Sequence, residues 1–73
     1  MGELGGISGK ETIRRFLSLG YEVIRQRGSH VRLRATGRKM LTIPLHKELK
    51  IGLLHQLIKD SGISLDDFLH LGK

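Results

Sequence analysis

Five residues near the middle of the chain, His-Val-Arg-Leu-Arg at positions 30–34, constrain the fold most strongly. Apolar and polar side chains alternate at every position, which is the period of a β-strand with one buried and one solvent-exposed face. If the valine and the leucine face a core, then His30, Arg32 and Arg34 share the opposite face. The segment therefore predicts a strand covered on one side only, with an imidazole among guanidinium groups on the other side.

The length of the chain and its charge distribution limit what this strand can belong to. The chain has 73 residues and no cysteine, which predicts a single domain over residues 1–73 with one core and no disulfide. The formal net charge is +6, and residues 25–50 alone carry eight cations against one carboxylate, or +7. Positive charge concentrated in one third of a domain predicts a polyanionic partner. Nucleic acid is the first candidate, followed by an anionic membrane surface and an acidic protein.

The hydropathy of the chain argues against a membrane protein. No apolar run approaches the roughly 18 residues that span a bilayer. The first residues, Met-Gly-Glu-Leu-Gly-Gly, lack the basic and apolar regions of a signal peptide. We therefore expect a cytoplasmic protein that does not bind a membrane.

A helix is predicted over residues 9–19. Ser8 and Glu11 have the spacing of a capping box, in which each side chain accepts a hydrogen bond from the other residue's backbone N–H. The apolar face of this helix is predicted to consist of Ile13, Phe16 and Leu17. Residues 1–7 are rich in glycine, so we expect a loose lead-in in which only Ile7 packs.

Three strands are predicted over residues 21–27, 30–35 and 39–44, because these segments are rich in β-forming residues. The connections at 28–29 and 36–38 are short and contain glycine, so the strands must form antiparallel hairpins. The residues expected on the core side are Tyr21, Val23, Val31, Leu33, Leu41 and Ile43.

Two further helices are predicted in the last third of the chain. The second helix ends before Gly62, and its predicted apolar face consists of Leu49, Leu53, Leu57 and Ile58. A third, short helix begins after Ser64 as its N-cap, with Phe68 and Leu71 as apolar contacts.

The predicted elements define an α+β fold with the order α-β-β-β-α and a short extra C-terminal helix. The simplest packing places the helices on one face of a three-stranded antiparallel sheet and leaves the other face open. This is the topology of double-stranded-RNA-binding domains. Fold alone does not define a function, so the function must be argued from the residues on the open face.

His30 is the candidate catalytic residue on that face. In RNA the 2′-hydroxyl is an internal nucleophile, so a base that removes its proton allows attack on the adjacent phosphorus without a metal ion. Histidine suits proton transfer near neutral pH, and arginines bind phosphate and stabilise its developing negative charge. The predicted RNA-binding residues are Arg25, Arg27, Gly28, Ser29, Arg32, Arg34 and Lys39.

The other histidines have weaker claims. His46 follows the third predicted strand, where it is either a second catalytic residue or a loop residue. His55 and His70 lie within predicted helices, and we expect structural roles for both. No cluster of Cys, Asp or Glu lies near His30 at ligand spacing, so we expect neither a metal nor another cofactor.

Short segments along nearly the whole chain resemble one protein family, the HicA-type toxins of toxin–antitoxin pairs. The segments are Ser8-Gly9-Lys10-Glu11, Leu19-Gly20-Tyr21, Arg25-Gln26-Arg27-Gly28-Ser29-His30, Ile43-Pro44-Leu45-His46, Lys47-Glu48-Leu49-Lys50 and Asp60-Ser61-Gly62-Ile63-Ser64. The resemblance implies a double-stranded-RNA-binding-like fold and an mRNA interferase, an endoribonuclease in which His30 matches the catalytic histidine. It also implies a HicB-type antitoxin as the partner that masks the active site.

Three functions remain open at this point. The first is an endoribonuclease toxin that uses His30, and the second is a non-catalytic RNA-binding module that uses the same basic face. The third is a protein-interaction domain whose basic face contacts an acidic partner. The sequence Gly28-Ser29-His30 favours the first, since pure binding calls for arginine or lysine rather than a titratable ring at position 30.

Overall fold

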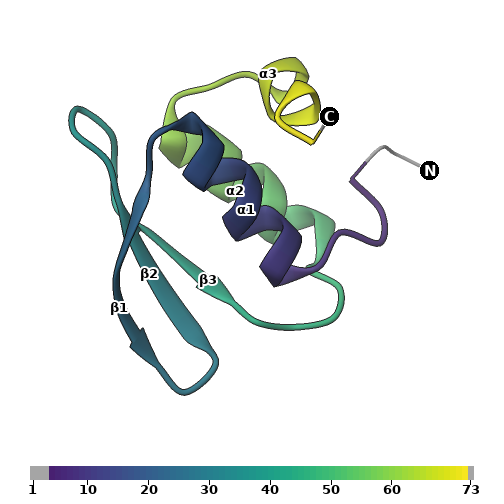
Figure 1. Cartoon of the computed structure of the whole chain (residues 1–73). Helices are drawn as coiled ribbons and strands as arrows, with labels where there is room; N and C mark the ends of the chain where they lie inside the picture. Colours follow the sequence, from purple (N-terminus) through teal and green to yellow (C-terminus); the bar gives the residue numbers. More distant parts are fainter. Residues whose placement is uncertain (1–3, 73) are drawn as a thin grey trace.

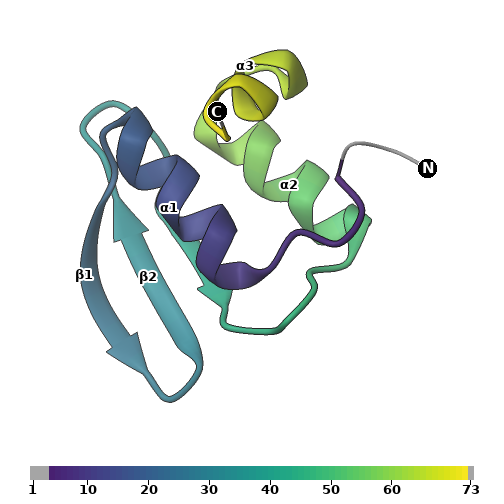
Figure 2. The ribbon, with the colours of Figure 1, turned by 45° about the vertical axis from the view of Figure 1, so that its right-hand side comes forward.

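Three antiparallel strands form one sheet, and the helices lie on one side of it (Figures 1 and 2). The structure, a computed structural model, describes residues 4–72; residues 1–3 and 73 of the predicted domain lie outside the described residues. The elements are α1 (Gly9–Leu19), β1 (Glu22–Arg27), β2 (His30–Arg34), β3 (Leu41–Pro44), α2 (Ile51–Ser61) and α3 (Leu65–His70). The predicted double-stranded-RNA-binding-domain-like fold is confirmed. Within residues 4–72, no helix has the length and apolar character needed to cross a membrane.

The strands are arranged in the order β1-β2-β3, so β2 is the central strand. Both pairings are antiparallel, as the short connections predicted. The first helix has the predicted bounds, whereas each strand is one or two residues shorter than predicted at one end.

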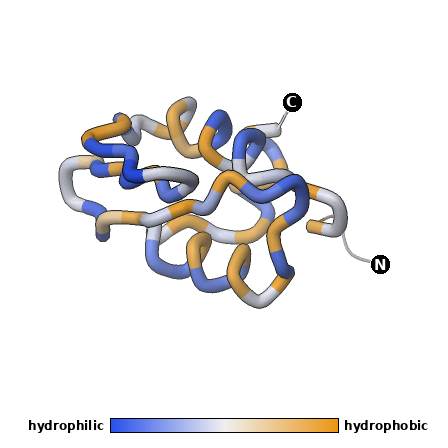
Figure 3. Tube along the Cα trace, turned by 90° about the horizontal axis from the view of Figure 1, so that it is seen from below, coloured by the Kyte–Doolittle hydropathy of each residue, from blue (hydrophilic) through white to orange (hydrophobic). Residues whose placement is uncertain are grey.

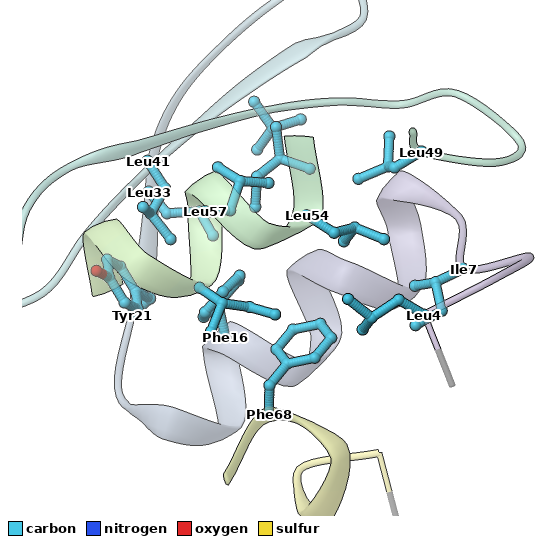
Figure 4. Packing of buried hydrophobic residues seen from close by; sticks show 13 residues of the cluster. Leu4, Ile7, Phe16, Tyr21, Leu33, Leu41, Leu49, Leu54, Leu57 and Phe68 are labelled. Atoms are coloured by element: carbon cyan, nitrogen blue, oxygen red, sulfur yellow. The ribbon is translucent and has the colours of Figure 1, made fainter. Parts of the chain in front are cut away.

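The core lies between the sheet and the helices, and β2 supplies its centre. Val31 and Leu33 are buried, as are Leu41 and Ile43 on β3, so the predicted core side of both strands is confirmed. Hydrophobic and hydrophilic positions alternate along the chain trace (Figure 3). Figure 4 shows the leucines of the sheet facing α2, and Phe16 of α1 beside Phe68 of α3.

Strand β1 was predicted to contribute Val23 to the core, and this prediction is wrong. Val23 pairs with Leu33, which places it on the core side of the sheet, but Val23 is 48% exposed. All six residues of β1 are exposed, because β1 is the edge strand on the far side of β2 from β3, and β3 is the strand against which α1 and α2 pack. Tyr21, just before the strand, is buried as predicted, and its hydroxyl donates a hydrogen bond to the carbonyl of Lys39 over 2.8 Å.

Two predicted helix faces are rotated in the structure. In α2 the core residue is Leu54, which is fully buried, and Leu53 is only partly buried. The prediction counted the helical repeat from Leu49. That residue is buried, but it precedes the helix and therefore does not follow the 3.6-residue repeat of α2. The buried residues of α2 are Leu54, Leu57, Ile58 and Ser61. In α1, Phe16 points into the core and its neighbour Leu17 is 42% exposed.

The predicted capping box of α1 forms only in part. The Ser8 hydroxyl accepts a hydrogen bond from the Glu11 N–H over 3.0 Å, but the Glu11 carboxylate binds Arg14 and Arg15 instead of the Ser8 backbone. The hydrogen bond from Arg14, followed by that from Arg15, lowers the pKa of Glu11 to about 2. A complete capping box is present in α3, where Ser64 was predicted as the N-cap.

The lead-in before α1 packs more tightly than predicted. Leu4 and Ile7 are both buried, so Ile7 is not alone in contacting the core. The Leu49 N–H donates a hydrogen bond to the Ile7 carbonyl over 2.8 Å, and the Gly6 N–H donates to Glu48. These bonds hold residues 4–7 beside the segment that precedes α2.

The first turn of α1 lies against the end of β3. The Gly9 N–H donates a hydrogen bond to the His46 carbonyl over 2.9 Å. A Cβ atom on Gly9 would lie 1.9 Å from the Pro44 carbonyl oxygen, so no side chain fits there. Glycine at this position therefore sets the distance between the helical layer and the sheet.

We expect Gly9→Ala to destabilise the protein and Gly52→Ala to stabilise it. Gly9 has backbone atoms where the methyl group would lie, whereas nothing lies within 4 Å of a Cβ on Gly52 in α2. Alanine is better than glycine in a helix by up to about 1 kcal/mol, and overpacking against backbone costs about 1–3 kcal/mol. Urea unfolding of the two variants measures both effects. Equal changes in the free energy of unfolding would contradict the close contact.

Candidate functional site

A hollow of about 320 Å³ lies on the open face of the sheet. It is lined by Arg25 and Arg27 of β1, His30 and Arg32 of β2, and Thr42 of β3. All five residues are exposed, and none is acidic. The sheet thus gathers three guanidinium groups, one imidazole and one hydroxyl from three strands at a single place.

The strand register explains why these residues meet. On β2, burial of Val31 and Leu33 forces His30 and Arg32 to the open face, as predicted. His30 pairs with Arg27, and Arg32 pairs with Arg25 on one side and with Thr42 on the other. Residues directly opposite each other on antiparallel strands point to the same face.

A bulge in β1 adjusts which of its residues reach that face. Glu22 pairs with Arg34 and Val23 with Leu33, but the next pair is Arg25 with Arg32, so Ile24 is an extra residue. Glu22 and Arg25 are an odd number of residues apart, and a regular strand would point them to opposite faces. With the extra residue, Glu22, Arg25 and Arg27 all lie opposite open-face residues of β2.

Two of the predicted RNA-binding cations lie outside the hollow. Arg34 is on the same face, but its Nη2 atom lies 3.1 Å from the Glu22 carboxylate. The Lys39 ammonium lies 3.6 Å from Asp60 of α2, and the neighbouring Arg38 donates to the Ser61 carbonyl at the end of that helix over 2.7 Å. The positive charge that the sequence places in one segment is therefore divided between the open face and the C-terminal end of α2.

The remaining predicted site residues lie near the hollow in sequence but do not line it. Gly28 and Ser29 form the turn between β1 and β2, where Gly28 has a φ of 59°. The Ser29 carbonyl accepts a hydrogen bond from the Leu45 N–H over 2.7 Å. His46 is exposed, and the structure does not bring it together with His30 in the hollow. His55 and His70 are exposed helical residues, as expected.

Thr42 is the lining residue that the sequence analysis missed. A threonine in a strand is common, so its residue type gives no signal by itself. Its position does give one, since Thr42 lies between Leu41 and Ile43, which were predicted to face the core. The same alternation places Thr42 on the open face beside Arg32.

The hollow has the chemistry of a phosphate site. Its guanidinium groups are donors that match phosphate oxygens, and an imidazole is a side chain that can serve as a general acid or base. Among residues 4–72, no group of three or more His, Cys, Asp or Glu side chains has an arrangement that could hold a metal ion. The fold and the hollow together define a small α+β protein of the double-stranded-RNA-binding-domain type with a cationic, histidine-containing open sheet face.

Comparison with known families identifies the chain more closely. A family model described as the HicA toxin of bacterial toxin–antitoxin systems matches residues 9–63, which is most of the 73-residue chain. The chain therefore belongs to the HicA toxin family and is a toxin of a toxin–antitoxin system. A search of curated proteins finds no match to this sequence.

The arginine pair across the hollow should lower the stability of the fold. Arg25 and Arg32 lie directly opposite each other, and like charges in such pairs are destabilising by a few tenths of a kcal/mol up to about 1 kcal/mol. We expect Arg32→Thr to raise the free energy of unfolding at low salt, with a gain that shrinks as salt screens the charges. The matched variant Arg34→Thr removes the ion pair with Glu22 and should lower stability. Urea unfolding at low and high salt measures the change in the free energy of unfolding for both variants. A change in the same direction for Arg32→Thr and Arg34→Thr would contradict the expected repulsion.

Proposed function

We propose that this toxin is an endoribonuclease, an mRNA interferase that cleaves RNA without a metal ion and uses His30 as its acid/base residue. The observation that carries the proposal is the position of His30 in a hollow lined by three arginines and a threonine. Membership of the HicA family supports the same conclusion. Cleavage of mRNA takes place in the cytoplasm, which is where we expect the protein to act.

The proposed reaction is an attack of the RNA on itself. His30 accepts the proton of the 2′-hydroxyl, the 2′-oxygen forms a bond to the adjacent phosphorus, and the bond from phosphorus to the 5′-oxygen breaks. The leaving 5′-oxygen takes up a proton from the protonated imidazole or from water, which leaves a 2′,3′-cyclic phosphate and a 5′-hydroxyl. Arg27, directly opposite His30, binds the phosphate and stabilises the charge that develops on it.

The family also suggests the protein partner. We propose that a HicB-type antitoxin neutralises the toxin by covering the open sheet face. The net charge of +6 and the three arginines of the hollow favour an antitoxin that presents acidic side chains there. Binding of the antitoxin and of RNA should then be mutually exclusive.

Binding should depend on the arginines of the hollow and not on those elsewhere. We expect Arg25→Ala and Arg32→Ala to weaken binding of a non-cleavable 2′-O-methyl RNA. Each change should also reduce the slope of the logarithm of the binding constant against the logarithm of the salt concentration, the salt slope, by about one. Arg34→Ala should leave the slope unchanged, because Arg34 is paired with Glu22. Titrations at several salt concentrations give the slopes. Unchanged slopes for the first two variants would place the contact surface elsewhere.

His30→Ala should abolish most of the cleavage and preserve the fold. One acid/base group contributes about 10²–10⁴-fold to a rate, and alanine at an exposed strand position costs about half a kcal/mol. His46→Ala should have the smaller effect, because His46 does not line the hollow. Rates on a defined RNA, with and without EDTA, measure the losses, and analysis of the ends identifies the cyclic phosphate.

Three results would contradict the proposed mechanism. The first is cleavage that stops when divalent metal is removed, and the second is equal cleavage of a 2′-deoxy substrate. The third is a His30→Ala variant that cleaves as fast as the wild type. Salt-dependent RNA binding without any cleavage would instead favour the non-catalytic RNA-binding module.

A further inference from the structure

The open face of the β1–β2 hairpin is a ladder of three residue pairs, which we call rungs. The first rung is Arg27 with His30, the second is Arg25 with Arg32, and the third is Glu22 with Arg34. Successive rungs are two residues apart on β2, which corresponds to about 6–7 Å along the strand. This spacing is of the order of the separation between neighbouring phosphates in an extended nucleic-acid strand.

The three rungs differ in the charge that they offer to a ligand. In the third rung the Arg34 guanidinium and the Glu22 carboxylate lie 3.1 Å apart and neutralise each other. In the second rung the guanidinium groups of Arg25 and Arg32 have no hydrogen-bond or ion-pair partner among residues 4–72, and Thr42 on β3 adds a hydroxyl next to Arg32. The second rung therefore presents two solvent-exposed cations and a hydroxyl without a carboxylate partner in the described part of the chain.

The bulge at Ile24 produces this order of charges. If Ile24 occupied a regular ladder position instead of a bulge, Glu22 would point to the opposite face from Arg25 and Arg27, and Arg34 would lose its carboxylate partner. With the bulge, Glu22 faces Arg34, and the positive track has two open rungs before an ion pair ends it.

We propose that the second rung, Arg25 with Arg32 and Thr42, is a binding subsite for the phosphate next to the one that is cleaved. This inference rests on the proposed function in one respect, the assignment of the cleaved phosphate to the first rung. The ligand is a strand with two consecutive phosphates, and the ion pair of the third rung marks the end of this two-phosphate footprint. A bound phosphodiester also relieves the repulsion between the two opposed arginines.

The test pairs one substrate phosphate with one protein residue. The substrate is an RNA oligonucleotide in which a cleaved position carries the sole free 2′-hydroxyl and all other positions are 2′-O-methylated. The phosphate on either side of the cleaved one is replaced, one at a time, by an uncharged methylphosphonate. The cleavable oligonucleotides give kcat/KM. A fully 2′-O-methylated copy of each, with the same phosphate or methylphosphonate at every position, cannot be cleaved and gives Kd.

With the wild type, one of the two replacements should lower kcat/KM and weaken binding by about 10-fold or more, as expected for a charged hydrogen bond. With Arg25→Ala, the charged substrate should already show that loss, and the replacement should then have little further effect. Arg34→Ala is the matched control, since it removes a guanidinium from the same face and should keep the full sensitivity to the replacement. Thr42→Val and Thr42→Ser separate the hydroxyl from the shape of the side chain: serine should retain binding that valine loses.

Equal sensitivity of the wild type and Arg25→Ala to both replacements would overturn the subsite. Loss of that sensitivity in Arg34→Ala as well would also overturn it, because the effect would then follow net charge and not position. His30→Ala on the same substrate keeps the two proposals apart. If that variant cleaves normally, the proposed mechanism fails, while the coupling measured by binding still decides the subsite.

Discussion

The burial of Val31 and Leu33 in the central strand is the constraint on which the rest of the structure depends. These two side chains fix which face of β2 meets the helices, so His30 and Arg32 must face solvent. The strands on both sides follow this choice, because paired residues share a face: Arg25 and Arg27 on one side and Thr42 on the other. A shift of one residue in this register would bury the cations and expose the core.

The charges of the hollow do not stabilise the fold. The arginines of the hollow lie directly opposite another arginine or a histidine, and the hollow contains no carboxylate to offset them. Elsewhere in residues 4–72 the arginines have protein partners: Arg14 and Arg34 pair with carboxylates, and Arg38 donates to the Ser61 carbonyl. Unfavourable charge pairs that are confined to one hollow are typical of a site whose opposite charge arrives with its ligand.

The sequence was sufficient to predict the order of the elements, the bounds of α1 and the core side of β2 and β3. These features depend on local patterns, such as the alternation at residues 30–34 and the helical spacing that includes Phe16. The same alternation predicted that His30 and Arg32 face solvent. In a regular β1, the alternation that points Tyr21 and Val23 to the core would also point Arg25 and Arg27 there, and only the bulge at Ile24 brings the two arginines to the open face. Thr42 follows from the pattern around it, although its residue type carries no chemical signal.

The tertiary structure alone decided which residues the helices cover and which cations remain open. Val23 has the pattern of a core residue, but it lies on the edge strand farthest from β3, against which α1 and α2 pack, so it is exposed. Lys39 and Arg34 are basic residues of the predicted site, but Asp60 and Glu22 neutralise them. Alternation in the sequence determines the face on which a side chain lies in a regular strand such as β2, whereas the bulge in β1, the burial of a side chain and its charge partners depend on residues distant in the chain. The sequence of this protein therefore determined its strands and its basic face, and the packing of the helices and the bulge at Ile24 decided the extent of the site.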